Sequence, residues 1–336
     1  MRAMIINFSG IGNDIYTLPI LRCLEDHEDI ESYFYQESVV LEQSWFRESV
    51  GLKKFSGFFP SEWRRFSQLD LKQINKFIGL NRIDLIINIR NEGPSFDVNY
   101  YSFKNTNNED IDFWDLDFNN LKKELLAVSI LRMLSGHGVN ISNYNHFYLK
   151  GDAFPNHKSV SNIGFFIGGE NLNKRWILRY WERLLVLLLS TFPNINITLY
   201  PDIQDENIDF SEKIYSLYSD KYTGRISLEK NMSLVDLTLS LRGISLLIST
   251  DTFAVHLASA VGIKVFGLYF ATDPCVWGGY GGDFLCIRSS QFKECKYWKV
   301  LAGNCIHYYD YCKVASSNKK RLLPEDVCSA VCKLLN

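Results

Sequence analysis

The sequence has no strong charge of either sign, because 36 Lys and Arg residues nearly balance 38 Asp and Glu residues. General nucleic-acid binding needs a strong positive field, so the formal net charge of −2 argues against a nucleic-acid partner. The sequence has no run of about 18 or more apolar residues, so no transmembrane helix is expected. The strand-like run at 4–8 is not a signal peptide, which would need a longer apolar region and a small-residue cleavage site. We therefore expect a cytoplasmic protein, with peripheral contact with the inner membrane left open.

The cysteine pattern lacks any Cys-x-x-Cys pair, a spacing common in zinc sites. Cys23 stands alone, and the other seven cysteines lie between Cys275 and Cys332. In a cytosolic protein this crowding indicates reduced thiols or a metal more than disulfides. The pattern predicts no metal. The residues of a weak alternative metal site are Cys286, Cys295, Cys305 and Cys312.

Two domains are expected, because a domain usually takes roughly 100–200 residues and the chain has 336. Strand-like and helix-like segments alternate in both halves, which is typical of doubly wound α/β domains with parallel sheets. Around Tyr144–Val160 this alternation gives way to Asn, Gly, Pro, Lys and His, which indicates a linker. The predicted domains are residues 1–155 and 156–336, the second with a cysteine-rich loop and a final helix.

Apolar spacing predicts the individual elements. The first domain should open with a strand, a glycine-bearing turn and a helix at 14–26, and a second strand is expected at 83–89. The polar, acidic stretch 105–120 is expected to be a loop. The elements expected in the second domain are strands at 162–167, 195–200, 244–249 and 264–269 and helices at 174–191, 211–219, 234–241 and 252–261.

The most informative segment begins where an apolar strand ends at Ser249. Asp251 or Thr252 can cap the next helix, whose free backbone N–H groups and positive dipole end make an anion site. His256 lies one turn beyond Thr252 on the same helix face, within reach of a ligand held there. The carboxyl ends of parallel strands are where such folds bind ligands. Spacing alone is equally consistent with a purely structural role, in which Asp251-Thr252 only caps the helix and His256 is a core histidine.

Two more motifs follow the next strand: Thr272-Asp273-Pro274 and Gly278-Gly279-Tyr280-Gly281. Five glycines lie between Gly267 and Gly282, and such a loop lets backbone approach a ligand closely. Together with the Asp-Thr pair and the histidine, these motifs resemble glycosyltransferase family 9, the bacterial heptosyltransferases of lipopolysaccharide core synthesis. The resemblance is greatest to the heptosyltransferase I type. It extends over most of the chain and is thin at 33–55 and 96–120.

The resemblance implies a GT-B fold, in which two Rossmann-like domains face a central cleft. The donor nucleotide would sit on the C-terminal domain and the acceptor on the N-terminal domain. The implied reaction inverts the anomeric carbon and moves heptose from ADP-heptose to a lipopolysaccharide core or other surface-glycan acceptor. It needs no metal, and no cofactor besides the sugar-nucleotide substrate.

The resemblance also implies a set of donor-binding residues. Lys174, in the sequence Lys174-Arg175-Trp176, would meet the diphosphate, and Met232 would border the adenine. The family also places an acidic residue against the ribose. Asp205 and Glu206 both lie near the corresponding position, and Glu206 is the candidate. The remaining donor-site candidates are Asp251, Thr252, Phe253 and His256, with Phe253 standing where the family commonly has glycine.

The N-terminal motif departs from the family pattern. The family reads Gly-Asp followed six residues later by Pro, and that Asp is the proposed general base. Here Asn13 occupies the aligned position, and Asp14 follows one residue later. A neutral Asn cannot act as a base, so Asp14 is the candidate that would remove the acceptor proton. The same carboxylate would also be favoured simply by the positive end of a helix.

The resemblance also implies an acceptor-binding segment, Trp63-Arg64-Arg65-Phe66. It is similar to an Arg-Arg-Trp segment of the family that contacts acidic groups of the acceptor. Arg64 and Arg65 suit carboxylates and phosphates because guanidinium groups bind them with two hydrogen bonds. Arg90 occupies the family's acceptor-loop position. Nearby Lys53 and Lys54 would rest on a membrane surface or form a solvated helix face.

Two alternative functions stay open. Phe253 suggests a family 9 enzyme with a different sugar nucleotide, or with a protein acceptor as in autotransporter modification. Asn13 suggests a sugar-nucleotide-binding protein with weak catalysis. A nicotinamide oxidoreductase is disfavoured, because Gly10-x-Gly12 lacks the third glycine at the expected spacing.

Overall fold

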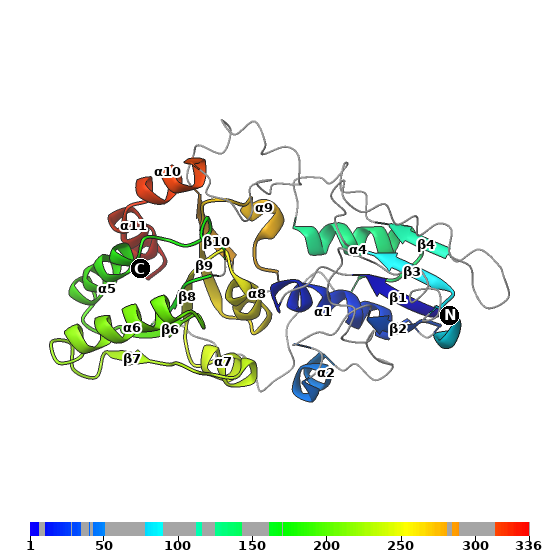
Figure 1. Ribbon diagram of the computed structural model, residues 1–336, viewed down its shortest axis with the longest axis horizontal. Helices are drawn as coiled ribbons and strands as arrows, with labels where there is room; N and C mark the ends of the chain where they lie inside the picture. Colours follow the sequence, from blue (N-terminus) through cyan, green and yellow to red (C-terminus); the bar gives the residue numbers. More distant parts are fainter. Residues whose placement is uncertain are drawn as a thin grey trace. The chain divides into compact units, whose positions relative to one another are not determined.

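The computed structural model describes most of the C-terminal half of the chain and several segments of the N-terminal half (Figure 1). The chain divides into two compact units, Met1–Lys150 and Gly151–Asn336. Among the described helices, none has both the length and the apolar character needed to cross a membrane. The described residues are 1–6, 11–27, 29–34, 40, 43–50, 78–89, 112–115, 125–142, 161–169, 171–280, 284–288 and 313–335.

The N-terminal unit contains a parallel four-stranded sheet in the order β2-β1-β3-β4. Strand β1 has β2 on one side and β3 on the other, so the strand order reverses beside it, as in doubly wound folds. The described elements are β1 (Arg2–Ile6), α1 (Ile11–Glu25), β2 (Glu31–Phe34), α2 (Ser44–Val50), β3 (Leu85–Asn88), β4 (Asp112–Asp115) and α4 (Leu126–Gly136).

Strand β4 corrects the loop that was expected over 105–120. The segment 112–115 reads Asp-Phe-Trp-Asp, so its acidic ends hide the strand in a scan for apolar runs. Its pairing with β3 places it at the end of the described sheet, where one of its two sides faces no described strand. A strand in such a position tolerates polar residues that a central strand would not.

The C-terminal unit contains a parallel six-stranded sheet in the order β7-β6-β5-β8-β9-β10. Numbered within the unit this is 3-2-1-4-5-6, the strand order of the dinucleotide-binding fold. The strands are β5 (Asn162–Ile167), β6 (Asn196–Pro201), β7 (Ile226–Leu228), β8 (Leu246–Thr250), β9 (Lys264–Tyr269) and β10 (Phe284–Arg288). The helices are α5 (Leu178–Thr191), α6 (Asp205–Tyr218), α7 (Leu234–Leu241), α8 (Phe253–Ala260), α9 (Pro274–Trp277), α10 (Lys313–Arg321) and α11 (Pro324–Leu335).

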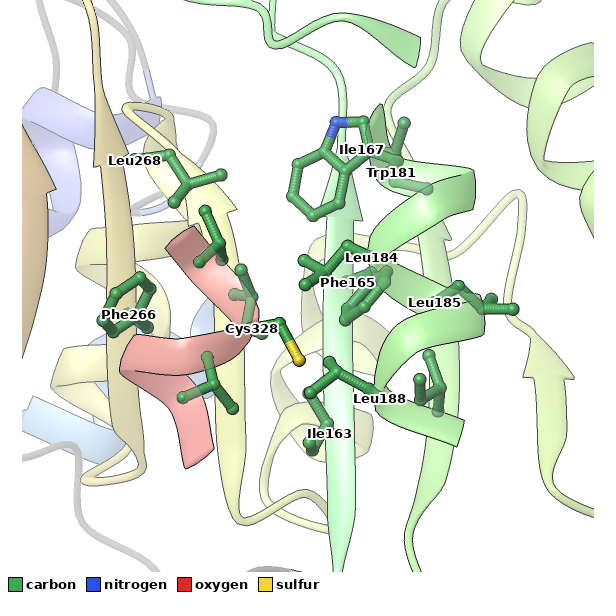
Figure 2. Packing of buried hydrophobic residues seen from close by; sticks show 14 of the residues in the cluster. Ile163, Phe165, Ile167, Trp181, Leu184, Leu185, Leu188, Phe266, Leu268 and Cys328 are labelled. Carbon is green, nitrogen blue, oxygen red and sulfur yellow. The ribbon is translucent and has the colours of Figure 1, made fainter. Parts of the chain in front are cut away.

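The core of the C-terminal unit lies between the sheet and helices α5 and α11. Figure 2 shows Phe165 of β5, Leu184 and Leu188 of α5, and Cys328 of α11 directed toward one another. Burying each of the leucine side chains contributes about 1.5–3 kcal/mol. Gly164 precedes Phe165 and faces the other side of the sheet, where an added Cβ would lie 2.5 Å from Ile244 and 3.1 Å from Leu247. Both faces of β5 are thus covered, which explains why every residue of the strand after Asn162 is apolar or glycine.

Three helix starts differ from those expected, and the first is that of α1, which begins at Ile11 and not at residue 14. The helix predicted from Lys174 begins only at Leu178. The side chain of Asn171 accepts a hydrogen bond from the backbone N–H of Asn173, and Lys174 N–H bonds to the Asn171 carbonyl, so a turn precedes the helix. The helix predicted at 211–219 begins earlier, at Asp205. Lys174 therefore lies on a turn, and Glu206 lies in the first turn of a helix.

Candidate functional site

The candidate site lies at the carboxyl ends of β5 and β8, where the strand order of the C-terminal sheet reverses. Strand β5 ends in a turn at Gly168 and Gly169, whose φ angles are 137° and 125°, a backbone conformation that favours glycine. The hydroxyl of Thr250, at the end of β8, donates to the carbonyl of Gly168 at 3.0 Å. This bond ties the two strand ends together at the place where such folds bind ligands.

Helix α8 begins directly after β8, and Thr252 is its cap. The Thr252 hydroxyl oxygen accepts from the N–H of Ala254 at 3.3 Å and lies 3.1 Å from the Ser249 hydroxyl oxygen. A helix start offers backbone N–H groups and a positive dipole end, which together favour an anionic ligand. The structure therefore assigns the cap to Thr252 and leaves Asp251 for another role.

Asp251 joins three segments of the C-terminal unit. Its side chain is 5% exposed, and its Oδ2 lies 2.8 Å from Nζ of Lys174, whose side chain is 15% exposed. The hydroxyl of Thr272, in the segment after β9, donates to the same carboxylate oxygen. Lys174 comes from the turn before α5, so the ion pair bridges the two sides of the strand-order reversal. A buried carboxylate with a charged partner and a hydroxyl donor is a well-satisfied group.

His256 is buried on α8, one turn after Thr252. Burial lowers the pKa of its imidazole from 6.5 to about 4, although the nearby Asp251 carboxylate opposes this shift and the Lys174 ammonium adds to it. The ring is therefore neutral at physiological pH. A neutral imidazole offers one N–H donor and one acceptor nitrogen. It is thus suited to hydrogen bonding beside an anion and does not itself add charge.

The lowered pKa of His256 should make the protein less stable in acid. Unfolding returns the pKa toward 6.5, so between pH 6.5 and 4 the unfolded chain binds a proton that the folded protein does not. Stability from this group is complete above pH 6.5 and falls by up to about 3 kcal/mol toward pH 4. Denaturant unfolding across this range should show a smaller loss for His256→Gln than for the natural protein. The exposed His137→Gln control should keep the full loss, and equal pH profiles for all three proteins would contradict the assignment.

The ribose candidate Glu206 lies in the first turn of α6 and is 68% exposed, with Oε2 3.3 Å from Nη1 of Arg175. Sequence reasoning missed a second carboxylate, Asp202, directly after β6. Asp202 Oδ2 accepts from the N–H of Gly169 at 2.9 Å, so this side chain lies at the turn that ends β5. The signal that could have found it is its position at the carboxyl end of a parallel strand.

Two apolar candidates lie near the helix starts. Met232 is half-buried and precedes Ser233, whose hydroxyl oxygen caps α7 by accepting from the N–H of Asp236 at 3.1 Å. Phe253, the first residue of α8, is half-buried and packs edge-to-face on Phe166 of β5, with ring centroids 5.3 Å apart and planes at 81°. The Phe253 ring is thus anchored against the sheet, while its backbone N–H lies at the helix start.

In the N-terminal unit, Asn13 and Asp14 both lie in the first turn of α1, which follows β1. Asp14 is 3% exposed, whereas Asn13 is half-buried. The Thr17 hydroxyl donates to the Asn13 carbonyl at 2.6 Å within the helix. The carboxylate therefore lies in the helix turn where the dipole favours negative charge. The three acceptor candidates, Arg64, Arg65 and Arg90, lie outside the described residues.

The candidate metal ligands are largely outside the described residues as well. Cys286 lies on β10 and is exposed, while Cys295, Cys305 and Cys312 are not described. In the part of the chain that is described, no three or more His, Cys, Asp or Glu side chains gather as a metal site would require.

The fold is shared with solved glycosyltransferases of the GT-B class. Escherichia coli heptosyltransferase WaaC with ADP matches with a TM-score of 0.61 and 16% identity, covering 99% of each chain. A family 9 glycosyltransferase from Veillonella parvula matches with a TM-score of 0.65 and 13% identity, covering 99% of this chain and 97% of that one. Escherichia coli ADP-heptose lps heptosyltransferase II matches with a TM-score of 0.61 and 13% identity, covering 100% and 98%. Two parallel α/β units with this architecture place the protein in the GT-B class.

A sequence match over just under half of the chain adds to the likeness in fold. Residues 144–301 match the model of glycosyltransferase family 9 (heptosyltransferase), a region that includes the whole Lys174–Asp251–Thr272 cluster. No curated protein matches the chain as a relative. This match confirms the predicted resemblance to glycosyltransferase family 9, and the predictions of a GT-B fold and of a glycosyltransferase are likewise confirmed.

Proposed function

We propose that this protein is an inverting, metal-independent heptosyltransferase. It would move heptose from ADP-heptose to a lipopolysaccharide core or another surface-glycan acceptor. With a lipid-linked acceptor, the transfer reaction would take place at the inner face of the membrane. The WaaC structures with ADP and with ADP-2-deoxy-2-fluoro heptose support the choice of nucleotide, because this chain has the same fold.

The observation that carries the proposal is the arrangement around Asp251. A lysine ammonium, a capped helix start and a neutral histidine all lie at the strand-order reversal. A nucleoside diphosphate carries the negative charge that an ammonium and a helix start bind. In our proposal Lys174 and the N–H groups after Thr252 hold the diphosphate, and His256 forms a hydrogen bond to the same ligand. Asp251 would hold the sugar hydroxyls.

The nucleoside would extend from the diphosphate toward β6 and α7. Met232 would border the base, and Glu206 or Asp202 would bind the ribose hydroxyls. Asp202 is closer in the chain to the end of β6, and its bond to Gly169 places it at the β5 turn. The N-terminal unit would bind the acceptor through Arg64, Arg65 and Arg90.

The reaction needs one bond made and one bond broken. An acceptor hydroxyl oxygen would attack the anomeric carbon of the heptose from the face opposite the leaving group, while the bond from that carbon to the ADP oxygen breaks. Asp14 would take the hydroxyl proton as a general base. ADP leaves with the bonding electron pair, and the Lys174 ammonium and the start of α8 stabilise its growing negative charge.

Phe253 supports a second candidate, a family 9 transferase with another sugar nucleotide or with a protein acceptor. Its ring lies at the start of α8 and is anchored by Phe166, so it takes up space beside the anion site that glycine would leave open. A donor with a differently shaped sugar would then be preferred. The first candidate is favoured by the matches to ADP-bound relatives, and the same experiment separates the two.

A thermal-shift panel of ADP, ADP-heptose, UDP-sugars and GDP-sugars tests the donor. A ligand that binds only the folded state stabilises it by about 2.7 kcal/mol at 100 times its dissociation constant, which shifts the melting temperature clearly. We expect selective stabilisation by ADP and ADP-heptose, with a smaller effect of adenosine because it lacks the diphosphate. Selective stabilisation by a UDP- or GDP-sugar would support the second candidate. No response to any nucleotide would contradict a donor site at Asp251.

A further inference from the structure

Thr272 is linked to the candidate donor site through Asp251. It is fully buried, and its hydroxyl donates to Oδ2 of Asp251, the oxygen that also lies 2.8 Å from Nζ of Lys174. Thr272 follows β9, Asp251 follows β8, and Lys174 precedes α5. Three segments far apart in the sequence therefore meet at one carboxylate oxygen.

A hydroxyl in this place needs a reason, because burying one costs free energy unless it forms a hydrogen bond. A valine would fill the same volume without that cost. The Asp251 carboxylate is almost fully buried, and a buried charge is stable only when a charged partner and further hydrogen bonds satisfy it. The Thr272 hydroxyl supplies such a bond. It also fixes the direction in which the carboxylate points, and hence the place of the ammonium bound to it.

We propose that Thr272 is a positioning residue: through Asp251 it holds the Lys174 ammonium beside the start of α8 before any ligand arrives. The phosphate-binding part of the site is then preformed. A lysine side chain that is already ordered loses less entropy when it binds a diphosphate, so affinity is gained without a contact between Thr272 and the ligand. The identity of the ligand in this inference rests on the proposed function. The ordering of the Lys174 side chain does not.

The test compares Thr272→Val, which removes the hydroxyl at constant volume, with Thr272→Ser, which keeps it. Thr238→Val is the matched control, since Thr238 is also fully buried and its hydroxyl donates at 2.7 Å to the Leu234 carbonyl within α7. Calorimetry would give the affinities for ADP and for adenosine. Only the cost of ordering the Lys174 side chain then enters the ADP affinity, so Thr272→Val should weaken ADP binding roughly two- to tenfold. Adenosine binding should be unchanged, and Thr272→Ser should bind ADP as the natural protein does.

The second readout needs no ligand. Acetylation of Lys174 by a lysine-reactive ester, followed by mass spectrometry, reports how firmly the ammonium is held. Thr272→Val should be labelled at Lys174 several times faster than the natural protein, while Thr272→Ser and Thr238→Val should not. If the natural protein binds no ADP but the labelling differs as expected, the proposed function fails and the positioning role stands. The positioning role would be overturned by unchanged labelling together with unchanged ADP affinity. An equal loss of ADP and adenosine binding would overturn it as well.

Discussion

Replacing Asp14 by Asn should lower the transfer rate by about 10²–10⁴-fold, the usual contribution of a general base. Asn has nearly the same shape as Asp, so the first turn of α1, in which Asp14 is buried, should keep its fold. An amide cannot accept the acceptor's proton, which is why kcat should fall while the affinity for ADP stays the same. Steady-state kinetics with ADP-heptose and a lipopolysaccharide-core acceptor, beside ADP calorimetry, measure both quantities.

Asn13 provides the matched control for Asp14. Asn13→Ala should retain most of the activity, because a neutral amide does no proton transfer. In the double variant Asn13→Asp/Asp14→Asn, recovery of activity would show that the α1 turn also supports a base one residue earlier. Full activity of Asp14→Asn alone would remove Asp14 from the mechanism and favour another route for the proton.

Replacing Lys174 by Met should have two separable effects. The variant loses the charge that would meet the diphosphate, so ADP affinity should fall about 10- to 150-fold, from the roughly 1.5–3 kcal/mol of a charged hydrogen bond. It also leaves the buried Asp251 carboxylate without its cation. Breaking a buried ion pair in this way costs about 3–5 kcal/mol of folding free energy. The partial exposure of Lys174 and the remaining Thr272 donor place the expected loss at the lower end.

A second substitution separates these effects. In Lys174→Met/Asp251→Asn no buried charge is left unpaired, so much of the stability should return while the ADP affinity stays low. Lys230→Met is the control, because Lys230 pairs with Glu212 at the surface, where such a pair contributes about 0–1 kcal/mol. Denaturant unfolding and ADP calorimetry give the two quantities. Unchanged ADP affinity in Lys174→Met would contradict the diphosphate role, whatever happens to the stability.

Much of the C-terminal unit could be predicted from local sequence. Strand β5 and helix α8 lie within a residue or so of the expected ranges, because an apolar run and a Thr cap are both local signals. The Asp251–Thr252–His256 segment was recognisable for the same reason, since its residues are adjacent along one strand end and one helix turn. The acidic β4 was missed, because its strand character depends on pairing with β3 and not on its own composition.

The contacts between segments could not be predicted in this way. The bond between Thr272 and Asp251 joins residues 21 positions apart, and the ion pair of Asp251 with Lys174 joins segments on either side of the strand-order reversal. Asp202 was passed over because its role depends on the turn at Gly169, which belongs to a neighbouring strand. The sequence by itself determined the resemblance to family 9, the α/β class and the residue types of the candidate donor site. The order in which the parallel strands pair decided the rest. It brings Lys174 and Thr272 to one carboxylate oxygen of Asp251, and it places Asp202 at the turn after β5.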